Sequence, residues 1–140
     1  MSVFIGIDTG VNTGVAVWDS EAKRFSEITT TSIVGAMKIV NDYAAAWPVT
    51  IVIEDARKRK WIPREKTQSE FKGKAMGAGS VKRDAKIWEE FSEFYNIPIE
   101  LRPPRKGMTK WSEDYWQKVT GWTKRTSEHA RDAALLVFQR

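Results

Sequence analysis

The chain has 140 residues, 41% of them hydrophobic and 29% charged, with a formal net charge of +5 and no cysteine. This length and apolar content predict a single domain spanning residues 1–140, and the lack of cysteine excludes disulfides, zinc–thiolate sites and thiol nucleophiles. No stretch has the ~20 apolar residues of a membrane span and no signal-peptide pattern begins the chain, so we expect a cytoplasmic protein without a membrane partner.

The first half of the chain is rich in strand patterns. Short apolar or alternating runs separated by turn residues predict three successive strands. A helical segment follows, on whose apolar side Val34, Met37, Ile39 or Val40, and Tyr43 recur at three- and four-residue spacing, and it ends before Pro48. The next run is apolar on both faces, which is typical of a central strand covered on both sides. In chain order, these predicted elements are strands over 3–9, 14–19 and 24–31, a helix over 33–47 and a strand over 49–54.

The second half is mainly helical. A long helix, a short strand containing Pro98 and two further helices are predicted, the third helix ending at Gly121 and the last beginning near Thr126 or Ser127. Three tryptophans on these helices, Trp88, Trp111 and Trp116, fit a core or an interface. The predicted ranges are 73–96, 97–101, 109–121 and 126–140. The order β-β-β-α-β-α-β-α-α predicts an α/β fold with a five-stranded mixed sheet and helices on both faces.

Three carboxylates occupy positions typical of a ligand site. Asp8 ends the first strand, Glu54 ends the most buried strand, and Asp132 lies near the start of the last helix. Carboxylates at strand ends lie at the rim of the sheet, where open α/β sheets bind ligands. Grouped carboxylates repel each other unless a cation neutralises them, and hard oxygen ligands favour Mg²⁺ or Mn²⁺. Two such ions can promote phosphodiester cleavage.

The single histidine, His129, lies three residues before Asp132, so both belong to one side of the predicted helix. It could bind a metal, act as a general base or orient a water molecule, or simply lie at the surface. Two neighbouring acids remain open as alternatives. Asp55 follows Glu54 but should point to the opposite face of the sheet, and Glu128 lies four residues before Asp132.

Four segments, taken together and in this order, resemble motifs of the RuvC-type Holliday-junction resolvases of the RNase H-like superfamily. They are Phe4–Gly10 with Gly14, Ile51–Glu54, Gly73–Ala78 and His129–Ala134. They extend over nearly the whole chain. The resemblance implies an RNase H-like fold, Mg²⁺-dependent cleavage of DNA junctions, and a homodimer contacting through the helix after Gly73.

Carried over by position, the resemblance implies that Asp8, Glu54, His129 and Asp132 form the catalytic, metal-binding set for Mg²⁺. From the carboxylate chemistry we expect two ions, with Mn²⁺ as a substitute. The chain is shorter than typical cellular members and has a more basic loop after Glu54. These departures suggest a phage or mobile-element version, whose substrate could be branched or flapped DNA as well as four-way junctions.

Two basic clusters predict contacts to DNA. The first surrounds Trp61 immediately after the Glu54 strand, where phosphate neutralisation and base stacking would suit distorted DNA. The second follows the strand over 97–101. The predicted DNA-binding residues are Arg57, Lys58, Arg59, Lys60, Trp61, Arg64, Lys66, Arg105 and Lys106.

Two other functions compete with the nuclease. An actin-like or sugar-kinase-type ATPase also has an acidic, glycine-containing turn after its first strand, but it needs two lobes and further glycine-rich loops. A non-catalytic RNase H-like DNA-binding module would not need Asp8, Glu54 and Asp132, all of which are present. Endonuclease activity is therefore the leading interpretation.

Overall fold

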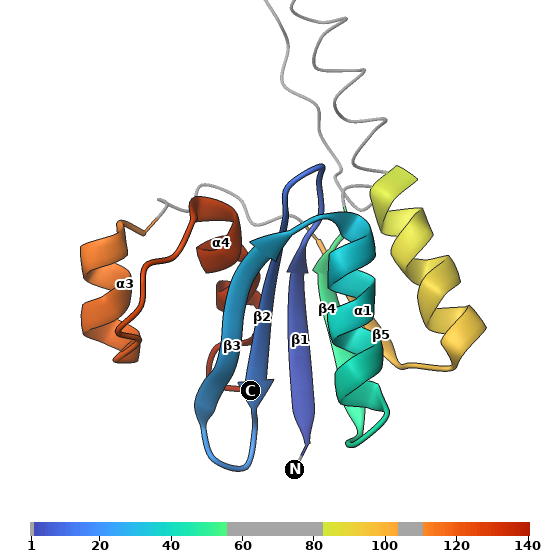
Figure 1. Cartoon of the computed structure of the whole chain (residues 1–140), viewed down its shortest axis with the longest axis horizontal. Helices are drawn as coiled ribbons and strands as arrows, with labels where there is room; N and C mark the ends of the chain where they lie inside the picture. Colours follow the sequence, from blue (N-terminus) through green and yellow to red (C-terminus); the bar gives the residue numbers. More distant parts are fainter. Residues whose placement is uncertain (1, 56–82, 104–110) are drawn as a thin grey trace, which may run out of the picture.

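The computed structural model describes residues 2–55, 83–103 and 111–140, which form a five-stranded mixed sheet in the order β3-β2-β1-β4-β5 (Figure 1). Antiparallel pairing joins β1, β2 and β3, whereas β4 is parallel to both β1 and β5. The strands are β1 (Val3–Asp8), β2 (Thr13–Asp19), β3 (Arg24–Thr31), β4 (Val49–Glu54) and β5 (Ile99–Arg102). The predicted α/β class and mixed sheet are confirmed.

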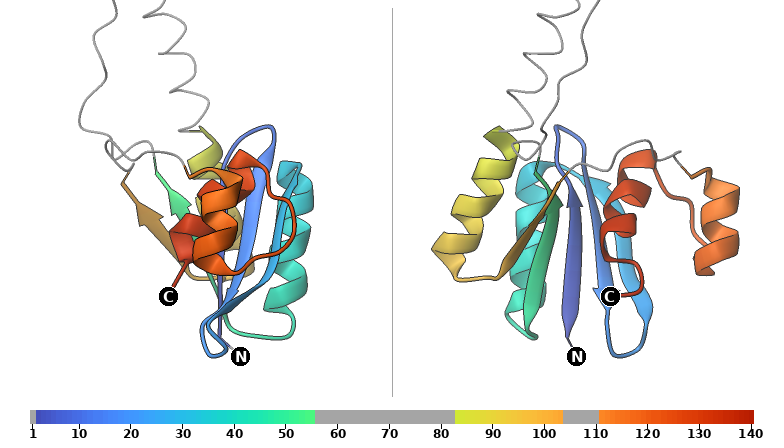
Figure 2. Two further views of the ribbon diagram at one scale, coloured as in Figure 1. Left: turned by 90° about the vertical axis from the view of Figure 1, so that its left-hand side faces the viewer. Right: turned by 180° about the vertical axis from the view of Figure 1, so that it is seen from behind.

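Helices cover both faces of this sheet, and Figure 2 shows α1 and α4 on opposite sides of it. The helices are α1 (Ile33–Ala44), a segment over residues 83–95, α3 (Glu113–Thr120) and α4 (Glu128–Val137). None of the helices in the described ranges is long and apolar enough to cross a membrane.

Local sequence explains where these helices begin and end. Ser32, Ser112 and Ser127 are the N-cap residues of α1, α3 and α4, and each side chain accepts a hydrogen bond from the backbone N–H three residues later. Gly121 ends α3 with a positive φ of 74°, a conformation that costs glycine little. Of the two expected N-cap residues of α4, Thr126 and Ser127, the structure selects Ser127, and the predicted stop of α3 at Gly121 is confirmed.

The first part of the hydrophobic core lies between α1 and the sheet. Trp88 and Phe91 from the 83–95 helix pack there with Val40 of α1. The strands contribute a continuous set of branched side chains, Val3, Ile5, Ile7, Val15, Val17, Val49, Ile51 and Ile53. Trp88 is completely buried, as predicted. Val34, which the helical spacing placed on the buried side of α1, is instead 75% exposed, because Ala36 and Val40 face the sheet.

The opposite face is covered by α4, with Trp116 of α3 packed beside it. Trp116 is fully buried and lies 5.5 Å, centroid to centroid, from the ring of Phe25 on β3. The α4 side chains buried in this cluster are two alanines, Ala133 and Ala134, followed by the larger Leu136 and Val137. Small side chains allow the helix backbone to approach the sheet closely, which determines the geometry of the candidate site.

Candidate functional site

Five residues lie side by side, one on each strand, along the edge of the sheet where β1, β3, β4 and β5 end and β2 begins. We call them the edge row: Thr30, Gly14, Asp8, Glu54 and Arg102. Gly14 pairs with Thr30 on one side and with Asp8 on the other, and Glu54 pairs with Arg102. Ile7 and Ile53 are partners immediately before Asp8 and Glu54. Because neighbouring strands lie about 4.8 Å apart, these two carboxylates begin from adjacent backbone positions.

Side-chain alternation decides which face of the sheet each acid occupies. Ile7 and Ile53 belong to the core under α1, so the next residue on each strand, Asp8 or Glu54, faces α4. The same alternation would return the following residue, Asp55, to the α1 face, and Asp55 is only 3% exposed. The expectation that Asp55 and Glu54 point to opposite faces agrees with this arrangement, which leaves Glu54 as the β4 acid on the α4 side.

The first turns of α4 rest directly on the sheet because two glycines leave room for the helix backbone. A Cβ atom at Gly14 would lie 2.0 Å from the carbonyl oxygen of His129. A Cβ atom at Gly6 on β1 would lie 2.1 Å from the carbonyl oxygen of Ala133, one helical turn later. The helix therefore crosses from β2 to β1 with backbone touching backbone, and His129 lies next to the edge row.

His129 contacts Asp8. Its Nδ1 atom lies 2.9 Å from Asp8 Oδ2, and the His129 and Asp8 side chains are 53% and 30% exposed. An ionised carboxylate only accepts hydrogen bonds, so this contact places a proton on Nδ1 of the imidazole. The structure thus joins two of the four predicted site residues, although they are 121 positions apart in the sequence.

The remaining predicted residues are near this pair in the fold. Glu54 is exposed on the strand next to Asp8, and Asp132 is partly exposed on α4, one turn after His129. Glu128, the alternative acid, is exposed in the first turn of α4. Among the described residues, His, Asp and Glu side chains form no group of three or more close enough to hold a metal ion.

The chemistry of the donors nevertheless suits a hard divalent cation. Asp8 and Glu54 supply carboxylate oxygens from adjacent strands on one face, and Asp132 is a third carboxylate on the helix covering that face. Mg²⁺ typically takes one or two protein carboxylates together with water. Asp8 and Glu54, with Asp132 in support, are therefore the described residues that could hold such a cation.

Arg102 and Thr30, at the two ends of the edge row, anchor α4. Arg102 donates from Nη1 to the carbonyl oxygen of Leu136 near the end of the helix, at 3.2 Å. Thr30 makes a short hydroxyl–hydroxyl hydrogen bond with the N-cap Ser127. No sequence pattern indicates a role for Thr30, and Arg102 belongs only to the second predicted basic cluster, beside Arg105 and Lys106. Thr30 pairs with Gly14 and Arg102 pairs with Glu54, so the strand pairing is the signal that places both residues beside the candidate site.

The predicted DNA-binding residues, Arg57, Lys58, Arg59, Lys60, Trp61, Arg64, Lys66, Arg105 and Lys106, lie outside the described residues. Their attachment points are described: the chain leaves β4 after Glu54 and leaves β5 after Arg102. Because β4 and β5 are parallel, both departures occur at the edge of the sheet that carries Asp8 and Glu54.

Positive charge is concentrated in the two stretches that begin there. Residues 56–82 and 104–110 hold 12 of the 23 Lys and Arg residues but only 2 of the 18 Asp and Glu residues. The rest of the chain therefore holds 11 basic and 16 acidic residues. The basic character of the protein thus belongs to sequence attached next to the edge row.

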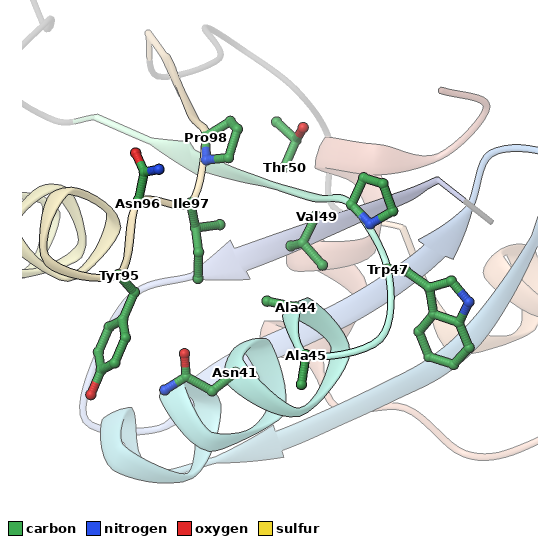
Figure 3. Close-up of a pocket in the computed structure, with 11 residues that line it drawn as sticks. Asn41, Ala44, Ala45, Trp47, Val49, Thr50, Tyr95, Asn96, Ile97 and Pro98 are labelled. Carbon is green, nitrogen blue, oxygen red and sulfur yellow. The ribbon is translucent and has the colours of Figure 1, made fainter.

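A pocket of about 430 Å³ lies at the opposite end of the sheet, between the C-terminal end of α1 and the beginning of β4 (Figure 3). Its lining includes Asn41, Trp47, Val49, Tyr95 and Pro98. Val49 begins the strand that Glu54 ends. The pocket is thus separated from the edge row by the length of β4 and is not part of the candidate site.

Comparison with protein-family models and with curated proteins found no match to this chain.

Proposed function

We propose that this protein is a divalent-cation-dependent, structure-selective endodeoxyribonuclease that cleaves Holliday junctions or other branched DNA during recombination or DNA processing. The observation that carries the proposal is the edge row. Asp8 and Glu54 lie on adjacent strands and on one face, and α4 brings His129 into hydrogen-bond contact with Asp8. The mixed five-stranded sheet is compatible with the RNase H-like fold that the sequence motifs imply.

The site residues have distinct roles in this proposal. Asp8, Glu54 and Asp132 hold Mg²⁺, or Mn²⁺ in its place, and the chemistry of phosphodiester cleavage favours two ions. A bound cation of this kind supplies a more acidic water and neutralises charge on the phosphate. The carboxylates also determine where the phosphate sits, because they fix the cation relative to the rigid ends of β1 and β4.

His129 has a separate task. With its Nδ1 proton donated to Asp8 Oδ2, its Nε2 atom is left as a proton acceptor. An imidazole held in one tautomer by a carboxylate can take a proton from an attacking water, which is general-base catalysis. Asp8 thus orients His129 in addition to holding the cation.

The distribution of charge supports DNA as the substrate. The described part of the chain is acidic overall, and the basic residues that could neutralise phosphates belong to stretches attached beside Asp8 and Glu54. Phosphate contacts from Lys and Arg supply most of the affinity of DNA-binding proteins. DNA held by these residues would therefore lie at the carboxylate edge, in the cytoplasm where we expect the enzyme to act.

Symmetric resolution of a four-way junction requires two cuts, so we expect the active form to be a homodimer with one site in each subunit. Light scattering coupled to gel filtration tests this directly. A mass near twice the 16.0 kDa of the chain is expected, and a mass that remains monomeric on junction DNA would contradict the dimer.

The decisive experiment uses labelled four-way junction, flap and linear duplex, each with Mg²⁺, Mn²⁺ or EDTA. We expect cation-dependent nicks in branched DNA and none in linear duplex. Asp8→Asn and Glu54→Gln should abolish cleavage but preserve binding in gel-shift assays, because the basic residues are unchanged. Asp42→Asn, on the exposed side of α1, is the matched control and should cleave normally. Cleavage at wild-type rates by both site variants would refute the assignment.

A further inference from the structure

The edge row and the start of α4 are held together by three successive contacts at one level of the sheet. On β3, Thr30 bonds the N-cap Ser127. On β2, Gly14 lies under the backbone of His129. On β1, Asp8 contacts the His129 imidazole at 2.9 Å. The strand register places Thr30, Gly14 and Asp8 in one line. The first turn of α4 is therefore held by a contact on each of the three strands.

We infer that Gly14 and Thr30 are positioning residues of the candidate site, which hold the first turn of α4 where the His129 imidazole meets Asp8. Only the expected effect of these residues on the rate of catalysis rests on the proposed function. Neither residue supplies chemistry. Gly14 acts through the absence of a side chain and Thr30 acts through a hydroxyl bonded to the helix cap.

The geometry indicates how strict the requirement at Gly14 is. A methyl group there would stand 2.0 Å from the His129 carbonyl oxygen, 2.4 Å from its carbonyl carbon and 2.9 Å from Ala130 N. All three atoms are backbone, so no side-chain rotation relieves the overlap, and ordinary contact requires more than 3.4 Å. The helix start would have to move by more than 1 Å, and displacements of this size can reduce the rate of catalysis about 100-fold.

The contact at Thr30 acts differently because it adds no bulk. Both hydroxyl groups lie at the surface, so Thr30→Val removes the bond while keeping the shape of the residue and the β-propensity of the strand. Ser127 retains its bond to the N–H of Ala130, so α4 keeps its cap. Only the attachment of the helix start to β3 is lost, which should loosen His129 without unfolding the helix.

The test reads the state of His129 directly, since it is the only histidine in the chain. Long-range ¹H–¹⁵N spectra of the imidazole at a pH where it is neutral distinguish a proton on Nδ1 from a proton on Nε2. The wild type should show the proton on Nδ1, and Asp8→Asn, which removes the carboxylate partner, should shift the population toward Nε2. Gly14→Ala should resemble Asp8→Asn, and Thr30→Val should shift part of the way.

Val137→Ala is the control, because it destabilises the same helix two turns beyond His129 by removing a fully buried side chain. It should keep the wild-type imidazole signature and turnover. Gly14→Ala should lower kcat about 100-fold with little change in KM. A folded Gly14→Ala protein with a wild-type signature would overturn the inference, and if that variant does not fold, an unchanged signature in Thr30→Val overturns it. The spectra require no nuclease activity, so failure of the proposed function would be seen separately, as absence of cleavage by the wild type.

Discussion

Replacing Gly6 by alanine tests whether α4 rests on β1 as tightly as the structure indicates. The new methyl group would lie 2.1 Å from Ala133 O, 3.1 Å from the Ala133 carbonyl carbon and 3.3 Å from Val137 Cγ1. Overpacking usually costs about 1–3 kcal/mol, and the upper end applies because two of the three atoms are backbone. Removing a glycine from a strand returns about 0.5–1 kcal/mol through the unfolded state. The net expectation is a loss of about 2 kcal/mol.

Urea unfolding monitored by tryptophan fluorescence measures this difference. Gly35→Ala is the matched control: a Cβ atom there would meet the Thr31 hydroxyl at 2.2 Å, a side-chain atom that can rotate away, and alanine favours the helix. The control should therefore remain within about 1 kcal/mol of the wild type, given the helix preference of alanine over glycine. A Gly6→Ala protein as stable as Gly35→Ala would refute the close contact between α4 and the sheet.

Three further predictions concern other parts of the molecule. Trp88→Ala should lower the free energy of unfolding in urea by about 3–5 kcal/mol, because Trp88 is fully buried. Trp88→Phe should lower it much less, because no partner in the described ranges bonds the Trp88 indole N–H. Equal losses of stability in the two variants would contradict this prediction. Burial, and secondarily the Glu27 carboxylate that accepts a hydrogen bond from its hydroxyl, raise the pKa of Tyr43 above its ordinary value. Stability from this pair should therefore be lost as pH rises through that pKa, and Glu27→Gln should lower the Tyr43 pKa in an ultraviolet titration; an unchanged titration would argue against the contact. Trp61→Ala should reduce junction cleavage much more than thermal stability, and a large fall in Tm instead would identify Trp61 as a core residue.

Much of the architecture could be predicted from the sequence, because apolar periodicity reports burial on each element. The continuous apolar run before Glu54 indicated a strand covered on both faces, and β4 lies between β1 and β5 under helices on both sides. Capping chemistry narrowed the start of α4 to Thr126 or Ser127, and Ser127 is the N-cap. Periodicity was less reliable on short amphipathic helices. Val119 lies three residues after Trp116 on α3, yet it is 42% exposed, because Trp116 is the residue that buries this helix in the core.

The candidate site was predictable in its residues but not in its geometry. Strand ends indicated Asp8 and Glu54, and helical spacing joined His129 to Asp132. The contact between His129 and Asp8 depends on how α4 crosses the sheet, which is determined by Gly6 and Gly14 under its backbone. Such tertiary contacts leave no local periodicity. The role of Thr30 likewise depends on a register between β2 and β3 that no spacing within either strand specifies.

We propose that Asp8 and Glu54 of the edge row, with Asp132, bind a divalent cation beside His129. Mn²⁺ is paramagnetic and broadens nuclear resonances close to it, so the imidazole signals of the single histidine report the site directly. Substoichiometric Mn²⁺ should broaden the His129 signals in the wild type, excess Mg²⁺ should restore them, and the combined Asp8→Asn and Glu54→Gln substitutions should prevent the effect. His129 signals that stay sharp in the wild type, or that broaden equally in the doubly substituted protein, would contradict the claim.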